Sequence, residues 1–142
     1  MLPPPHRLSD LDSRSLERVL PRRPLLILPV GALEAHGPHL PLGADLIQAE
    51  ATADALAERL DALVAPGLAY GVCPGTRRFP GSVSRSLEGL SREVREILGE
   101  FFRQGFRRVL VLSGHGDSGH MAALREGARQ AAEDHPGLAV AA

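Results

Sequence analysis

The fold of this chain is decided by residues 28–45, which read LPVGALEAHGPHLPLGAD. The stretch begins inside residues 24–30, PLLILPV, a short apolar run bounded by a proline and a glycine. Such a run is typical of a strand that is covered on both faces. The stretch ends at Asp45, where apolar residues begin to recur at helical spacing. The sequence therefore predicts a buried strand, a polar loop and an amphipathic helix in succession.

The predicted loop carries acidic and imidazole side chains at Glu34, His36, His39 and Asp45. Oxygen and imidazole ligands suit hard and borderline metal ions, and a loop on a rigid α/β framework can aim them at one point. Glu34 and His36 are two residues apart, so both project to the same side of an extended segment. We interpret the loop as half of a metal site. The alternatives are a surface histidine at His36 and an ordinary helix N-cap at Asp45.

A second polar cluster follows another apolar run. Residues 107–113, RRVLVLS, predict a strand that leads into GHGDSGH at 114–120 and then an Ala-rich helix to about Asp134. The carboxyl ends of parallel strands share one edge of the sheet, so His115 and Asp117 are expected to meet the first loop. Two carboxylates and two imidazoles can hold one ion, or two ions if a carboxylate bridges them. Asp117 is the candidate for a further ligand.

The remaining elements complete an α/β pattern. Strands that alternate with helices predict a mainly parallel sheet with helices on both faces. The expected elements are a short helix capped by Ser9 or Asp10 and running to about Leu20, a helix over 45–60, a short apolar run at 62–66, a loop over 67–84, a helix over 87–102 stopped by Gly105, and a strand at 138–141.

Composition limits the class of protein. The 142 residues suffice for about one domain, and 44% of them are apolar and 23% charged. A net charge of -1 gives no electrostatic case for binding nucleic acid or an anionic membrane. All sixteen basic residues are arginine, which excludes P-loop and Schiff-base lysines. Cys73 is the one cysteine, so we expect neither an intramolecular disulfide nor a thiolate zinc cluster, and we expect a cytoplasmic setting without a membrane span.

Residues 28–45 resemble the first signature of the creatininase (creatinine amidohydrolase) family. The match continues in order through PGLAYG at 66–71, FPGS at 79–82, and GFRR at 105–108 leading into SGHG at 113–116. Four ordered matches along most of the chain are more specific than any single motif.

This resemblance implies a three-layer α/β/α sandwich and a two-metal centre of zinc, manganese or iron. It implies a metal-dependent amidohydrolase that uses metal-activated water to hydrolyse an amide-type C–N bond, in a small cyclic amide, a formamide or a peptide-like substrate. By position, Glu34 and His115 would hold one ion, His36 the other, and Asp45 would bridge them. Creatininase itself has a glutamate two residues after the second-motif histidine, and Asp117 would replace it with a shorter reach.

The chain also departs from the family pattern. SGHGDS at 113–118 stands where most members have Asn-Gly-His-Gly-Gly-Asn, and the later segment that supplies a further ligand and an acid–base histidine is missing. We therefore expect residues 1–142 to form one creatininase-like domain without the C-terminal part of the family, with residues 1–8 mobile. His39 or His120 is the candidate proton donor, and the alternative for each is a surface or packing histidine.

Three explanations of the missing segment stay open. Asp117 completes a compact site, a longer partner subunit supplies the rest, or the chain is a shortened, non-catalytic metal-binding or assembly subunit. The apolar residues 138–142 suggest a homo-oligomer, because an uncovered sheet edge favours association. GDSG at 116–119 resembles the nucleophile region of chymotrypsin-like proteases, but the surroundings are α/β and a nucleophile elbow needs glycine where His120 stands.

Overall fold

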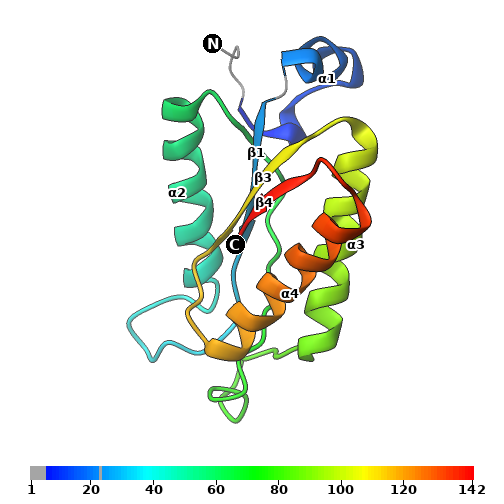
Figure 1. Ribbon diagram of the computed structural model, residues 1–142. Helices are drawn as coiled ribbons and strands as arrows, with labels where there is room; N and C mark the ends of the chain where they lie inside the picture. Colours follow the sequence, from blue (N-terminus) through cyan, green and yellow to red (C-terminus); the bar gives the residue numbers. More distant parts are fainter. Residues whose placement is uncertain (1–5, 23) are drawn as a thin grey trace.

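The computed structural model describes residues 6–22 and 24–142 (Figure 1). Four strands form one parallel sheet in the order β2-β1-β3-β4, and their bounds are Leu25–Val30 for β1, Leu63–Val64 for β2, Arg108–Ser113 for β3 and Ala139–Ala141 for β4. β1 pairs with β3 in register from Leu25 opposite Arg108 to Val30 opposite Ser113. The carboxyl ends of these two strands are therefore level, and the loops that leave them start side by side.

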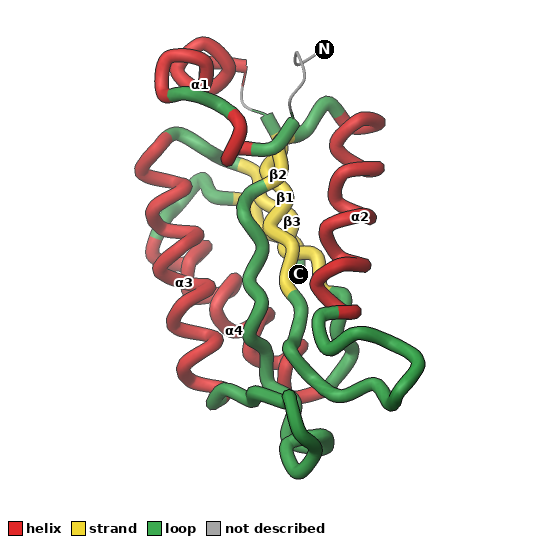
Figure 2. Tube along the Cα trace, turned by 180° about the vertical axis from the view of Figure 1, so that it is seen from behind, coloured by secondary structure: helices red, strands yellow, loops and turns green. Residues whose placement is uncertain are grey.

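Helices cover both faces of the sheet. α2 (Ala44–Leu60) lies on one face, whereas α3 (Leu87–Gln104) and α4 (Ser118–Asp134) lie on the other, as the front and back views both show (Figures 1 and 2). The short α1 (Ser13–Val19) lies at the end of the sheet away from the polar loops. This arrangement confirms the predicted three-layer α/β/α sandwich with a parallel sheet.

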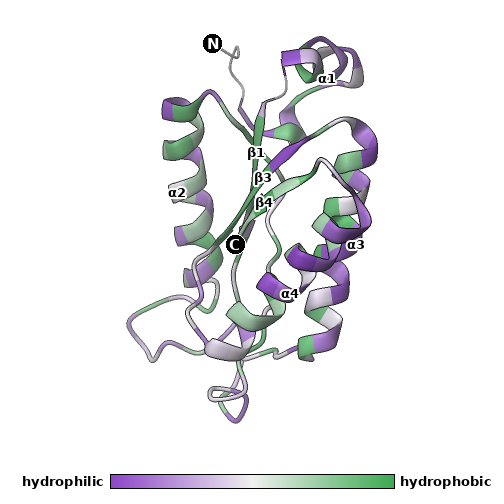
Figure 3. Ribbon diagram, in the orientation of Figure 1, coloured by the Kyte–Doolittle hydropathy of each residue, from purple (hydrophilic) through white to green (hydrophobic). Residues whose placement is uncertain are grey.

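The core divides along β1 according to the alternation of side chains in a strand. Leu26, Leu28 and Val30 belong to the larger cluster beneath α3 and α4, whereas Ile27 belongs to a smaller cluster beneath α2. β1 is apolar through most of its length, while the helices carry hydrophilic residues on their outer faces (Figure 3). Full burial of each such aliphatic side chain contributes about 1.5–3 kcal/mol, so burial on both faces stabilises this central strand.

The ends of the helices follow local chemistry. Ser86 caps α3 by accepting a hydrogen bond from the Gly89 N–H, and Gly105 ends the helix with a φ of 112°, as predicted. The prediction that Ser9 or Asp10 caps the first helix is wrong. Leu8–Asp10 forms a 3₁₀ turn, and α1 begins later because the Asp12 side chain accepts from the Ser15 N–H.

The start of the chain is partly fixed. The expectation of mobility for residues 1–8 falls mainly on 1–5, which lie outside the described residues. His6 and Arg7, by contrast, make contacts: the Val64 N–H donates to the His6 carbonyl at 2.8 Å, and the Arg7 guanidinium pairs with Asp54.

Within residues 6–22 and 24–142, none of the helices is long and apolar enough to cross a membrane.

Candidate metal centre

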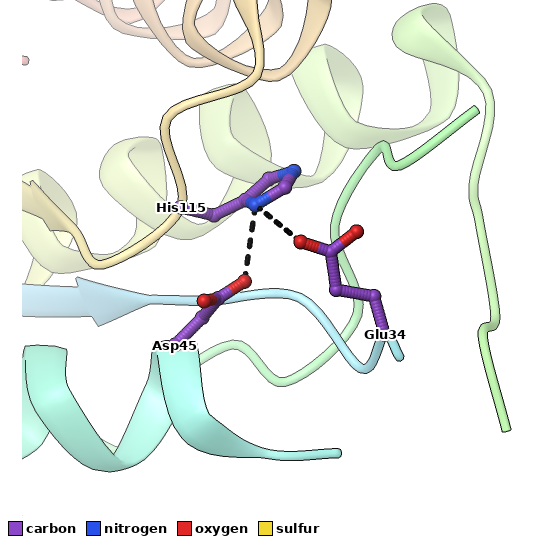
Figure 4. A group of neighbouring side chains, drawn as sticks. All are labelled: Glu34, Asp45 and His115. Carbon is purple, nitrogen blue, oxygen red and sulfur yellow. Dashed lines mark ion pairs between the residues drawn. The ribbon is translucent and has the colours of Figure 1, made fainter. Parts of the chain in front are cut away.

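Polar side chains from two loops and one helix converge at the carboxyl ends of β1 and β3. Glu34 and His36 lie on the loop after β1, Asp45 lies in the first turn of α2, and His115 follows β3. Figure 4 shows Glu34, Asp45 and His115 pointing toward one another. Their exposed fractions are only 8%, 6% and 8%, so these charged and polar groups are withdrawn from water.

His115 faces two carboxylates. Its Nε2 lies 3.0 Å from the Val72 carbonyl oxygen, and because a carbonyl only accepts, Nε2 carries a hydrogen. Metal binding requires a neutral ring, whose lone pair would then be on Nδ1, and this atom lies 3.1 Å from Glu34 Oε1 and 3.0 Å from Asp45 Oδ2. One ligand atom from each of these three residues lies within 4.8 Å of the others.

His36 has the same kind of contacts as His115, but with the two ring nitrogens exchanged. Its Nδ1 lies 3.0 Å from the backbone carbonyl of Glu34, so Nδ1 carries the hydrogen. Its Nε2 lies 3.0 Å from Asp45 Oδ1 and 3.6 Å from Glu34 Oε1. Asp45 therefore offers a different oxygen to each imidazole, which is the arrangement of a carboxylate that bridges two ions.

The buried carboxylates of this cluster favour the binding of cations. Two buried carboxylates face ring nitrogens of two histidines, and taking such charges out of water costs several kcal/mol each unless opposite charge compensates them. Asp45 Oδ2 is buried without a hydrogen-bond partner, although His115 Nδ1 is close to it. Imidazoles that bind metals usually donate their other N–H to a backbone carbonyl, as both do here. The donor set and its orientation therefore fit a pair of divalent ions.

Glycines allow the start of α2 to approach both loops. A Cβ atom on Gly114 would lie 2.0 Å from the Asp45 carbonyl oxygen, and one on Gly31 would lie 2.5 Å from the Leu46 nitrogen. Neither position can accept a side chain without moving that backbone. This close packing sets Asp45 between the two histidines. The alternative that Asp45 is an ordinary helix N-cap does not hold, because α2 begins at Ala44 after Gly43 and the Asp45 side chain contacts the imidazoles.

A third segment supports the centre without supplying one of these ligands. The middle loop, residues 65–86, contributes the Val72 carbonyl to His115 and the Thr76 hydroxyl, which donates to Glu34 Oε2 at 2.6 Å. The Ser82 hydroxyl accepts from the Ala35 N–H at 2.9 Å. The sequence pattern indicates no role for Val72 or Thr76. The matches at 66–71 and 79–82 were the available signal, and they flank Val72 and Thr76 without including them.

Asp117 lies beside the centre but serves first as a helix cap. Its Oδ1 accepts a hydrogen bond from the His120 N–H at 3.0 Å and starts α4. It is outside the group of three residues whose ligand atoms cluster within 4.8 Å, and it lines an open hollow of about 410 Å³ together with Val72 and Arg77. Its assignment as a metal ligand therefore stays a prediction.

His120 is a buried packing residue. It is 0% exposed, its Nδ1 accepts from the Val72 N–H at 3.2 Å, and its Nε2 lies 3.2 Å from the Ser113 hydroxyl. Burial, together with the nearby His115 ring, lowers the pKa of His120 to about 4, so the ring is neutral. Both ring nitrogens of His120 are engaged within the fold, and its assignment as a proton donor stays a prediction. His39 is exposed on the first loop, and its role as a proton donor stays a prediction.

The geometry does not support a serine nucleophile. Ser118 is the exposed first residue of α4. The ring nitrogens of His115 contact Val72 and the two carboxylates, and those of His120 contact Val72 and Ser113. Neither neighbouring histidine is therefore placed to activate Ser118 as a general base.

Comparisons with known proteins agree with this geometry. The family described as creatinine amidohydrolase matches residues 9–142. A creatinine amidohydrolase from Pseudomonas putida is 41% identical over 96 residues, which are 64% of this chain and 37% of that protein. A mycofactocin precursor peptide peptidase from Mycolicibacterium smegmatis is 36% identical over 121 residues, which are 79% of this chain and 46% of that protein.

Solved structures give the same result. A manganese form of creatininase superposes with a TM-score of 0.90 at 30% identity, over 96% of this chain and 57% of that one. A creatininase variant of Zn–Zn type superposes with a TM-score of 0.88 at 31% identity, over 97% of this chain and 57% of that one. The chain thus spans less than half the length of the two curated relatives and somewhat more than half of the solved chains.

Proposed function

The chain belongs to the creatininase family, and on this premise we propose that it carries the two-metal centre of a hydrolase acting on an amide-type C–N bond. The observation that carries the proposal is the position of Asp45. It places one oxygen 3.0 Å from His36 Nε2 and the other 3.0 Å from His115 Nδ1. A carboxylate between two imidazole lone pairs is suited to bridge two ions.

We assign Glu34 and His115 to one ion, His36 to the other, and Asp45 to both. Asp117 is proposed as a further ligand through the oxygen that does not cap α4. Zinc, manganese or iron would suit two carboxylates and two imidazoles. The manganese and Zn–Zn forms of the related solved structures support the first two of these metals.

A pair of divalent ions at such a centre supplies two functions, the activation of water and the polarisation of a carbonyl group. The residues of this chain supply the remainder. Glu34 and Asp45 would place two negative charges beside the ions, and the backbone carbonyls of Val72 and Glu34 orient the imidazoles by accepting their other N–H groups. His39 is the proposed donor of a proton to the leaving nitrogen. The names of the two relatives support a cyclic amide or a peptide-like amide as the substrate.

Metal analysis joined to an amide panel tests this function. We expect purified protein dialysed against manganese or zinc to hold about two ions per chain, which is the stoichiometry of two-metal hydrolase sites. It should hydrolyse at least one member of a panel of cyclic amides, formamides and short peptides. The His36→Ala, Asp45→Ala double variant should lose both properties. Absence of bound metal in the unaltered protein would overturn the proposal.

A second candidate is a metal-binding or assembly subunit without activity of its own. It requires only the proposed ligands Glu34, His36, Asp45 and His115, and no proton donor. Bound metal without hydrolysis in the same panel would support it. Restoration of activity on mixing with a longer family member would then identify that partner.

We also propose a homo-oligomer in the cytoplasm. Within the described residues, β4 pairs with β3 and forms one edge of the sheet. Its residues Ala139 and Ala141 are exposed, so a second copy of the chain could pair with this edge. Cys73 is a buried free thiol, as suits a reducing compartment. Light scattering that shows a monomer at working concentration would contradict the oligomer.

A further inference from the structure

Thr76 contacts Glu34 on the side away from the metal centre. Its hydroxyl oxygen lies 2.6 Å from Glu34 Oε2, while Glu34 Oε1 lies 3.1 Å from His115 Nδ1 and 3.6 Å from His36 Nε2. The two oxygens of this carboxylate therefore have different environments. One is held by a hydroxyl group, and the other faces both imidazoles.

The direction of this hydrogen bond is fixed by chemistry. An ionised carboxylate only accepts, so the Thr76 hydroxyl donates its single hydrogen. The same hydroxyl lies 3.3 Å from the Cys73 carbonyl oxygen, but one hydrogen cannot serve both acceptors fully. A hydrogen bond to a charged acceptor is shorter and stronger than one to a neutral acceptor, so Glu34 is the principal partner.

Backbone contacts hold Thr76 opposite the ligand loop. The Val83 N–H donates to the Leu33 carbonyl at 2.9 Å, and the Ala35 N–H donates to the Ser82 hydroxyl at 2.9 Å, so the middle loop is bound to both neighbours of Glu34. The Thr76 carbonyl accepts from the Phe79 N–H at 2.8 Å, which closes the turn that carries the hydroxyl. The hydroxyl is therefore placed by the loop and needs no rearrangement to reach Glu34.

We propose that Thr76 is a positioning residue that makes Glu34 a single-oxygen metal ligand. The inference rests on the proposed two-metal function. By occupying Oε2, Thr76 leaves Oε1 as the oxygen available between His115 and His36, and it stops the carboxylate from rotating out of that position. Glu34 and Asp45 then play different parts, because Asp45 offers both of its oxygens to the centre and Glu34 offers one.

The test compares metal affinity in three variants. Thr76→Val removes the hydroxyl while keeping the shape of the side chain, Thr76→Ser keeps the hydroxyl, and Thr52→Val removes an exposed α2 hydroxyl that contacts the Gln48 carbonyl. Competition with a chromophoric chelator measures zinc affinity without recourse to activity. Loss of an outer-shell partner weakens metal binding about 10–100-fold, and we expect this range for Thr76→Val. Thr76→Ser and Thr52→Val should stay within about threefold, because neither removes that partner.

The outcomes separate the two proposals. If the unaltered protein binds two zinc ions and Thr76→Val binds them equally tightly, the role of Thr76 is overturned and the proposed function stands. Equal weakening in Thr76→Ser would also overturn it, since the hydroxyl would not be the cause. If the unaltered protein binds no zinc, the proposed function fails first. Thr76→Ala takes the place of Thr76→Val in the same comparison if circular dichroism shows that Thr76→Val does not fold.

Discussion

The loops that follow β1 and β3 differ from the middle loop in what they give to the centre. The former, with the first turn of α2, supply Glu34, His36, Asp45 and His115. The middle loop, residues 65–86, supplies none of these, but it provides partners to the ligands and their neighbours, among them Val72 and Thr76. Under the proposed function, the first region would determine which ions can bind, and the middle loop would determine how firmly their ligands are oriented. The predictions below test this division.

The largest expected effect belongs to Asp45. Asp45→Asn replaces a charged oxygen and weakens the side chain that offers a separate oxygen to each imidazole, so we expect a fall from two bound ions to none after dialysis. His36→Ala should retain the ion at His115 and fall only to one. The measurement is the metal-to-protein ratio by plasma mass spectrometry. One retained ion in Asp45→Asn would show that Asp45 is not a bridge.

Next in size is the effect of His120 on stability. His120→Ala leaves the Val72 N–H without its buried acceptor and opens a cavity, so we expect a loss of about 2–4 kcal/mol in the free energy of unfolding. The control is His135→Ala, since that ring stacks on Phe102 at 5.0 Å and is partly exposed, and its loss should cost under about 1 kcal/mol. Urea denaturation without metal measures both. Equal losses in the two variants would contradict the inference that buried His120 contributes more to stability than His135.

A smaller effect separates two serines of the middle loop. Ser82 accepts from the Ala35 N–H on the ligand loop, whereas Ser84 accepts from the Cys73 N–H within the middle loop itself. Each alanine variant should lose about 1 kcal/mol of stability, the usual value of one such hydrogen bond. Only Ser82→Ala should also weaken zinc binding, by about threefold to tenfold, because an outer-shell contact to the ligand loop is lost. Chelator competition measures the zinc affinity of both variants. Equal weakening in Ser82→Ala and Ser84→Ala would contradict the view that only the contact to the ligand loop affects zinc binding.

The smallest effect is expected for Ser118→Ala. Ser118 is exposed, and its nearest histidines in the sequence are engaged elsewhere. Its loss should change amide hydrolysis by less than about twofold and stability by at most about 0.5 kcal/mol, the range of ordinary surface substitutions. Loss of all activity would instead restore the serine-nucleophile alternative.

The same division explains what could be predicted from the sequence. The strands at β1 and β3 and the helix ended by Gly105 follow apolar periodicity and local end signals, so their positions were predicted to within a residue or two. The ligand-bearing loops could be placed because strand ends share one edge of a parallel sheet. The contacts of His120 could not be predicted, because its burial depends on packing between segments far apart in the chain. The contacts of Thr76 involve an irregular loop without periodicity, and no sequence pattern reports them.

Gly114 shows that a residue without a functional side chain can be as sensitive to substitution as a residue that binds a ligand. It has no side chain that could bind an ion, yet a methyl group there would lie 2.0 Å from the Asp45 carbonyl oxygen and displace the proposed bridging residue from His115. Alanine substitution confined to charged and polar positions would pass over it. A library that samples every position should instead rank Gly114 with the acidic ligands, and assays of metal content, rather than of folding alone, should reveal the defect.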